Sequence, residues 1–552
     1  MSEDAHGHGG EHSTDAHEKV VFHPGKIDAP LEQLLGVIVG SKSAALHRPD
    51  EDMITVSDTV SVAASVYETI RNTLEYDEEH LLRRNAIRRI VKRRIEEEDA
   101  KQLAADVLRE LIWARYLSNK KVPERMMDVL AGIFEKYRPL FAELRELQRD
   151  RERAFEWLTD MLSTEIEYAL VPPLADEALA SVAYQTLKDR VVWSSPLIAE
   201  ADRDMQLYIA VHRMVLKSNV ATLRFRLFTL YYPQWTRIKH TDALVHDVSV
   251  HLPTIIQSIE RQIKHPGAEP IARLVRRHTI IFHLLRDVAE DNPGALRGVV
   301  ETGDVASLDA ALTKAIRARY KRFHNRLRRS VFRAVLFLLF TKTLLAVLIE
   351  LPYEQIVLQT TDTLPLFVNI LFHPLLLGVL GLTVRLPEKK NTQQILDKIH
   401  ALLHMGKDFT VTFKTRRPWA AGAAGGIFKF LYGVMFLITV GLITWILQSF
   451  GFHTLSIVLF IFFLSLVMFF GYKIRSGKKD LMVIEQTGGF LGFLSDLMFL
   501  PVIRVGRWLA MRAPRINIFL FFFDFIIEAP FKGMIRLAES WIAFLREKKE
   551  EI

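Results

Sequence analysis

The sequence predicts an all-α fold: a polytopic helical membrane protein with a large N-terminal cytosolic helical domain and C-terminal interfacial amphipathic helices. Three observations lead to this fold class. Apolar residues recur every three or four positions over residues 31–329, without convincing strands of period two. Four later apolar runs are long enough to cross a bilayer, which takes about 20 helical residues. Basic residues gather in alternate connections of these runs, as in membrane proteins of fixed orientation.

The N-terminal part divides into a tail and a helical domain. Residues 1–30 are polar and His-rich, and we expect a disordered tail, not a signal peptide, because no basic start leads into an apolar core. The domain over 31–329 ends in a basic juxtamembrane helix. Clusters of Pro, Gly, Asn and Ser separate its expected helical segments. Their approximate ranges are 67–117, 122–171, 174–191, 198–230, 241–264, 268–289 and 305–329.

The four apolar runs predict four transmembrane helices, paired in two hairpins over 330–385 and 427–473. The connection LPYEQIVLQTTDT carries acids and no Lys or Arg, whereas the loop 386–426 between the hairpins is basic. The positive-inside rule then places this loop and both termini in the cytoplasm, and we expect a bacterial-type inner membrane. The spans themselves cover about 331–350, 364–384, 427–447 and 455–472.

The helix before the first span is basic at its membrane-proximal end and continues without a breaker into apolar sequence. We therefore expect one continuous helix to enter the bilayer. Its cations should attract anionic lipid headgroups. These residues are Arg317, Arg319, Lys321, Arg322, Arg326, Arg328, Arg329 and Arg333.

The region 474–552 is expected to lie at the membrane interface and to be amphipathic. The apolar stretch 487–512 contains Asp496, Arg504 and Arg507, so we expect it to be interfacial or re-entrant, not spanning. From residue 531 onward, apolar and charged side chains separate onto two faces, which is typical of a helix in the membrane surface. Docking of that apolar face on the cytosolic domain is the alternative.

A charge in the middle of the first span, Lys342, is costly in hydrocarbon and requires a partner or a wet cavity. In an antiparallel hairpin, Asn369 and His373 of the second span lie near the same depth. Two interpretations stay open: a path for protons or ions, or a hydrogen-bonded structural pin in which Lys342 contacts an acid such as Asp496 or Asp524. The expected intramembrane cluster comprises Lys342, Thr341, Thr343, Asn369 and His373, with Glu350 and Glu354 at its outer mouth.

No motif in the sequence names a reaction. Phosphate-binding loops and nucleophile elbows are missing, and the absence of cysteine excludes thiolate metal sites and Cys nucleophiles. The Arg-rich segment RRNAIRRIVKRRIEEE runs directly into acids, so we expect no nucleic-acid partner. We expect no cofactor. The weak metal candidates lie in RIKHTDALVHDVSVHLP and are His240, His246, Asp247 and His251, whose spacing is poor for a shared helix face.

These patterns favour a non-enzymatic membrane protein whose helical cytosolic domain binds, scaffolds or senses. Its expected partners are anionic membrane lipids and a protein that contacts the cytosolic domain. One alternative is a small transporter or channel, formed as a homo-oligomer, that uses the intramembrane Lys and His cluster. A second alternative is a membrane-bound, metal-dependent hydrolase.

Overall fold

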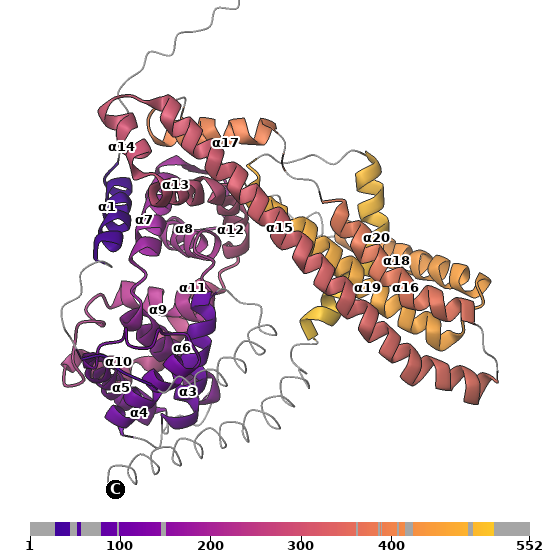
Figure 1. Ribbon diagram of the computed structural model, residues 1–552, viewed down its shortest axis with the longest axis horizontal. Coiled ribbons are helices and arrows are strands. Elements are labelled where there is room, and N and C mark those ends of the chain that lie inside the picture. Colours follow the sequence, from indigo (N-terminus) through magenta and orange to yellow (C-terminus); the bar gives the residue numbers. More distant parts are fainter. Residues whose placement is uncertain are drawn as a thin grey trace, which may run out of the picture.

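A computed structural model describes residues 28–44, 52–56, 79–95, 99–144, 151–359, 363–384, 387, 389–405, 408–414, 423–483 and 490–512. Helices dominate these ranges, so the predicted all-α class is confirmed. A two-lobed helical domain and an elongated helical bundle are joined by one long helix, α15, which spans Val305–Leu345 (Figure 1).

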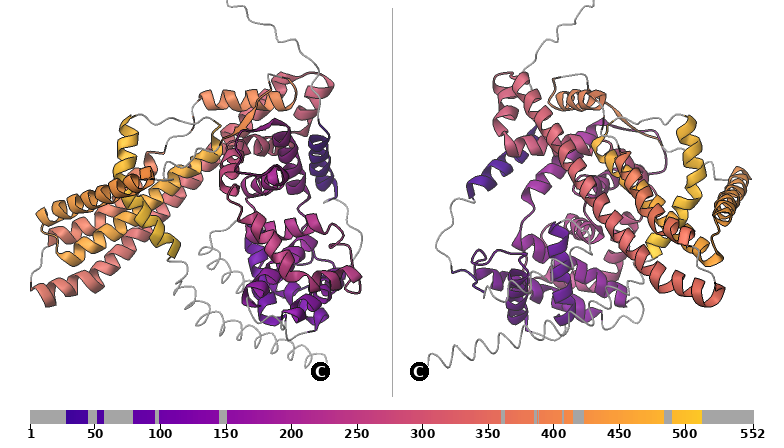
Figure 2. Two further views of the ribbon diagram at one scale, coloured as in Figure 1. Left: turned by 180° about the vertical axis from the view of Figure 1, so that it is seen from behind. Right: turned by 45° about the vertical axis from the view of Figure 1, so that its right-hand side comes forward.

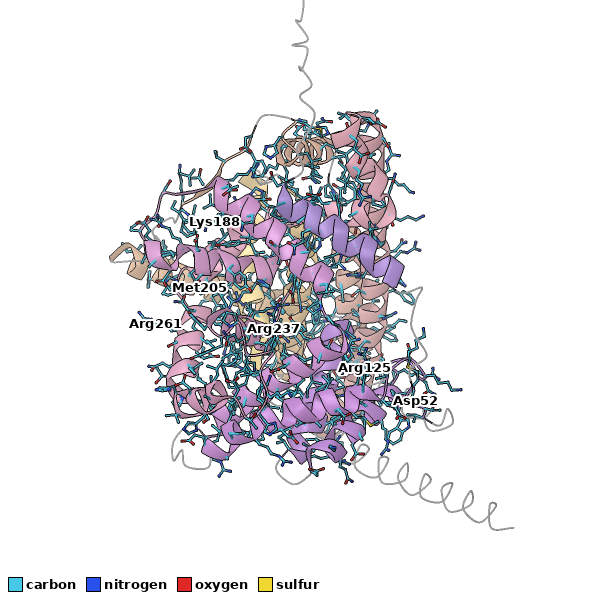
Figure 3. All side chains as sticks on the ribbon, turned by 90° about the vertical axis from the view of Figure 1, so that its left-hand side faces the viewer. Asp52, Arg125, Lys188, Met205, Arg237 and Arg261 are labelled. Atoms are coloured by element: carbon cyan, nitrogen blue, oxygen red, sulfur yellow. The ribbon has the colours of Figure 1, made fainter. Side chains whose placement is uncertain are left out.

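The first lobe, which we call the outer lobe, is an all-helical body with its own core. Ile87, Ile90 and Val91 of α3 (Glu79–Arg94) are buried in this core. Figure 3 shows this lobe below the second one, with Arg125 of α5 at its surface. Its helices are α3 (Glu79–Arg94), α4 (Ala100–Trp113), α5 (Arg125–Glu143), α6 (Arg151–Leu170), α9 (Val220–Tyr231), α10 (Ala243–Val250) and α11 (Leu252–Ile263).

The second lobe, which we call the stalk lobe, surrounds the first turns of α15. Leu308 and Leu312 of α15 are fully buried in its core. Lys188 lies on its surface in Figure 3, whereas Met205 of the same lobe packs against the outer-lobe core. Its other helices are α1 (Ala29–Ala44), α7 (Leu174–Arg190), α8 (Glu200–Met214), α12 (Ala268–Arg276), α13 (Thr279–Asp291) and α14 (Pro293–Glu301).

Several segments predicted as single helical stretches are two helices each. Residues 198–230 break where Lys217 adopts a positive φ of 54° and the Asn219 side chain caps α9 by accepting from the Thr222 amide at 3.0 Å. Residues 241–264 break at His251, and Pro253 stands in the first turn of the next helix. The apolar period continues across both breaks, so periodicity alone does not reveal them.

The bundle contains the predicted spans. Within the described ranges, four helical stretches are long and apolar enough to cross a membrane: Val305–Leu358, Leu364–Leu382, Phe430–Ser449 and Thr454–Gly477. The first confirms the predicted continuous helix, since α15 (Val305–Leu345) runs from the stalk lobe into the bundle (Figure 2). It is followed by the π-helical segments η1 (Ala346–Glu350) and η2 (Tyr353–Leu358), and then by α16 (Thr363–Leu382), α18 (Ala423–Ser449) and α19 (Thr454–Gly477).

The segments between and after the hairpins fold back onto the stalk lobe, and we call them the clamp. The clamp comprises α17 (Lys389–Leu402), strand β2 (Val411–Phe413) and the short helix η3 (Lys478–Leu481). Strand β2 pairs in parallel with β1 (Val191–Trp193), so the expectation of a purely helical domain is wrong at this point. Ile395 and Leu481 enter the stalk-lobe core. Residues of the segment 386–426 and of the segment after hairpin 2 thus contribute to the stalk-lobe core.

Polar contacts hold the clamp in place. Arg190 donates to Asp408 at 2.8 Å, and Arg276 donates to Asp480 at 2.5 Å. The Asn391 side chain donates to the Leu481 carbonyl at 2.9 Å and joins α17 to η3. Both basic connections of the bundle therefore lie on the side of the helical domain, as the charge pattern predicts.

The stretch 487–512 contains a further helix, α20 (Phe490–Arg512), which packs on α19 and crosses the bundle at a steep angle (Figures 1 and 2). Its approach to α19 is close because Gly506 has no side chain: a Cβ there would lie 1.9 Å from the Ser465 carbonyl oxygen. The predicted amphipathic helix after residue 531 lies outside the described residues.

Candidate intramembrane polar site

The predicted cluster forms between α15 and α16, which are antiparallel neighbours in the bundle (Figure 2). Lys342 is 1% exposed, although Phe337 and Phe340 on the same helix point outward and are 70% and 67% exposed. Asn369 and His373 are four residues apart on α16, and both are buried within the bundle. The polar residues therefore face the interior of an otherwise lipid-facing pair of helices.

One side-chain amide links the two charged groups of the site. The Lys342 ammonium donates to Asn369 Oδ1 at 2.5 Å, and Asn369 Nδ2 donates to Glu350 Oε1 at 2.6 Å. The ammonium also lies 4.4 Å from the centroid of the Phe463 ring on α19, a cation–π contact. Glu350 is 1% exposed, and its Oε2 atom has no hydrogen-bond partner within the described part of the chain.

The π-helical turn η1 is what brings Glu350 inward. A π-helix widens the turn and rotates the following residues relative to α-helical positions. Pro352, two residues after Glu350, lacks an N–H and cannot donate the α-helical hydrogen bond at that position. Glu350 and Glu354, which we expect at the outer mouth of the cluster, are both buried, at 1% and 2% exposure.

His373 contacts backbone carbonyls with both ring nitrogens. Nδ1 lies 3.2 Å from the carbonyl oxygen of Asn369, and Nε2 lies 3.0 Å from that of Phe460 on α19. The side chain has no solvent exposure. His373 therefore joins α16 to α19, whereas Lys342 joins α15 to α16.

Thr341 and Thr343 do not belong to the cluster. Their hydroxyls donate to carbonyls of their own helix, those of Phe337 and Leu339, both at 2.9 Å. Such bonds need no partner helix. The suggested acidic partners of Lys342, Asp524 and the side chain of Asp496, are outside the described part of the structure.

Sequence reasoning missed the α19 side of the site. The Phe463 ring and the Phe460 carbonyl belong to a span whose sequence looks uniformly apolar, and a backbone carbonyl gives no sequence signal. Glu350 was associated with the cluster, but its direct bond to Asn369 depends on the π-turn. Pro352 is the one sequence feature that marks that turn.

The basic juxtamembrane residues divide into two groups. Arg319 is turned to the protein and donates to Asp287 at 2.7 Å, and Arg322 reaches the same carboxylate at 3.3 Å. The other members of the set are exposed beside the apolar surface of α15, where Phe332 is 62% exposed. These exposed residues are Arg317, Lys321, Arg326, Arg328, Arg329 and Arg333.

The metal candidates stay apart. His240 contacts Glu135 at 3.2 Å, whereas His251 contacts Asp247 of its own helix at 3.2 Å. His246 is exposed on α10. Within the described ranges, no three His, Cys, Asp or Glu side chains come together as metal ligands.

The outer lobe contains a second buried polar network. Glu165 accepts hydrogen bonds from Lys136, from Tyr137 at 2.8 Å and from the Trp235 indole at 2.9 Å. Burial, followed by the charge of Glu165, raises the pKa of Tyr137 well above its usual value. Lys136 and Glu165 line a cavity of about 810 Å³, which reaches Leu174 at the start of α7. Small-molecule sites have volumes of this order.

Comparisons of this chain with protein-family models, with curated proteins and with solved structures find no match.

Proposed function

We propose that this chain is a non-enzymatic integral membrane protein whose helical domain is a cytoplasmic binding or scaffold module held in a fixed orientation to the membrane. One observation supports it most directly. The helix α15 has 41 residues and extends without interruption from the stalk-lobe core at Leu308 to Lys342 in the bundle. Such a helix is about 60 Å long. Movement at either end is therefore passed to the other.

The clamp adds a second mechanical connection. Asn391 on α17 bonds the Leu481 carbonyl, so the chain leaving hairpin 1 and the chain leaving hairpin 2 meet at one point of the stalk lobe. A domain tethered only by a flexible linker would need neither the continuous helix α15 nor the clamp. Rigid attachment suits a module that positions a partner or senses the state of the bundle.

The cytoplasmic location rests on charge. Exposed arginines such as Arg326 and Arg329 lie where α15 enters the bundle, and the basic connections lie on the same side. The positive-inside rule assigns that side to the cytoplasm. The same exposed cations supply the contacts expected for anionic lipid headgroups.

The binding role is tested by photo-crosslinking in native membranes. A crosslinking amino acid is placed at Val129 or Leu174, which line the 810 Å³ cavity and are 46% and 57% exposed. Glu200 is the matched control, since its side chain is 90% exposed on the stalk lobe away from the cavity. We expect an adduct at Val129 and Leu174 that is missing at Glu200. The absence of an adduct at both Val129 and Leu174 would contradict the binding role.

Transport is the second candidate, because a buried Lys342 is otherwise costly in a membrane. Its partners make a structural pin the better interpretation: the ammonium is bonded to Asn369 and covered by Phe463. The absence of cysteine allows a direct test. Lys342→Cys is treated with a charged, membrane-impermeant thiol reagent from each side, with Ser330→Cys and Ser449→Cys as controls for the two ends of the bundle. Labelling of Cys at 342 would favour transport, and no labelling with reactive controls would favour the pin.

A further inference from the structure

Among the residues that the structure describes, both hydrogen-bond partners of the His373 ring are acceptors. Its ring nitrogens point at the carbonyl oxygens of Asn369 and Phe460, at 3.2 and 3.0 Å. A carbonyl oxygen can only accept. A neutral imidazole has one N–H, so it can satisfy one of the two carbonyls, whichever tautomer it adopts. The second nitrogen then turns a lone pair toward a carbonyl lone pair in a fully buried position.

An imidazolium would satisfy both carbonyls, because each ring nitrogen then carries a hydrogen. We propose that His373 is a reversible proton-binding site at the junction of α16 and α19. The proton adds to the ring nitrogen that lacks hydrogen, and no bond breaks in the protein. The gain is a second N–H···O bond, so that the ring is bonded to its own helix through Nδ1 and to α19 through Nε2 at the same time.

Some charged groups around His373 disfavour its protonation, and others favour it. Lys342 on α15 repels a positive imidazole, whereas Glu350 on η1, joined to Lys342 through Asn369, offsets that repulsion. Glu354 on η2 is a further buried carboxyl of this region. On α19, the Phe460 and Phe463 rings pack against the His373 ring, with centroids 4.5 and 6.1 Å away. The proton is therefore held by a balance of nearby charges and not by one strong ion pair, so it can exchange.

Proton binding at His373 has a route to the helical domain through α19. Its last turn leads into η3, where Asp480 bonds Arg276 and Leu481 enters the stalk-lobe core. A change in how α16 and α19 are held together would therefore reach the clamp. This consequence rests on the proposed sensing role, whereas proton binding itself does not.

The proton is observed directly by magic-angle-spinning NMR of the full-length protein, labelled with ¹⁵N-histidine and reconstituted in lipid. The chain has 19 histidines, so the His373 signals are assigned by their absence from His373→Gln. At high pH we expect the signals of one protonated and one unprotonated ring nitrogen, and at low pH the signals of two protonated nitrogens. The change is expected between about pH 4 and 8. A His373 ring whose protonation stays the same over this range would overturn the proposal. This spectrum does not depend on any partner or function.

The coupling between α16 and α19 is measured with an engineered disulfide. A Cβ at residue 471 would lie 3.6 Å from the Cβ of Leu380, within the range that disulfides need. Leu380→Cys with Gly471→Cys also removes the Leu380 methyl that crowds residue 471. The rate of disulfide formation is compared over pH in the double-cysteine variant with and without His373→Gln. Thiol ionisation contributes equally to both, so a difference reports on the protonation of His373. We expect the pH dependence to differ several-fold between the two variants. Superimposable pH profiles would show that the proton, if bound, does not alter this contact, and would overturn the coupling.

Discussion

Asn369 is the residue whose loss should weaken the bundle most, because it joins two charged groups at once. Asn369→Leu keeps the approximate volume but removes the acceptor of Lys342 and the donor of Glu350, bonds of 2.5 and 2.6 Å. Interhelical side-chain hydrogen bonds in membranes contribute about 0.6 kcal/mol on average and about 1.7 at most. Two such bonds give a loss of roughly 1 to 3 kcal/mol in the free energy of unfolding.

The assay is unfolding in mixed micelles with increasing sodium dodecyl sulfate, followed by circular dichroism. Thr341→Val is the matched control, since that hydroxyl bonds only its own helix, and we expect a change below about 0.5 kcal/mol. The triple variant Lys342→Met, Asn369→Leu, Glu350→Met should recover much of the loss, because it leaves no buried charge without its partner. An unchanged Asn369→Leu, or a triple variant less stable than the single one, would refute the structural pin.

Three further predictions concern packing, pH and domain boundaries. Gly506→Ala should displace α20 and lower the melting temperature, because the added Cβ would meet the Ser465 carbonyl. The control is Gly441→Ala on α18, where an added Cβ has nothing within 4 Å and the melting temperature should not change. Burial, followed by the charges of Lys398 and Arg277, lowers the pKa of His278 to about 3. Below about pH 6.5 the unfolded chain therefore binds more protons than the folded chain, and the free energy of unfolding falls on acidification, by about 3 kcal/mol at pH 4. His278→Gln should flatten this part of the pH profile of unfolding. A chain ending at residue 329 lacks the clamp and should elute from size exclusion as aggregate; a monodisperse fragment with native helicity would contradict this.

The polar cluster shows how far depth in a span predicts contacts. Lys342 and Asn369 were paired from their positions in an antiparallel hairpin, and the structure joins them directly. Thr341 and Thr343 have similar depth but lie on other faces of α15, so depth without rotation about the helix axis is insufficient. The rotation of Glu350 depends on a π-turn, and a lone Pro352 does not say whether the helix bends, ends or widens there.

The clamp was beyond reach of the sequence for a different reason. Strands β1 and β2 have three residues each, too few for a period-two pattern to be recognised, and they pair Val191 with Val411 across more than two hundred residues. The amphipathic α17 has the same composition as a solvated helix in a basic loop. Its apolar face, which includes Ile395 and Ile399, packs on the stalk lobe, and the sequence of α17 alone does not show which surface covers that face.

The clamp also orders how this chain can fold. The outer-lobe core draws its residues from positions 54 to 263, so that lobe is complete in sequence before the first span begins. The stalk-lobe core needs Ile395 from α17 and Leu481 from η3, which follow hairpin 1 and hairpin 2. Its apolar surface can therefore be fully buried only after both hairpins have been made and have returned to the same side. Correct assembly of the bundle is thus a condition for a closed stalk-lobe core.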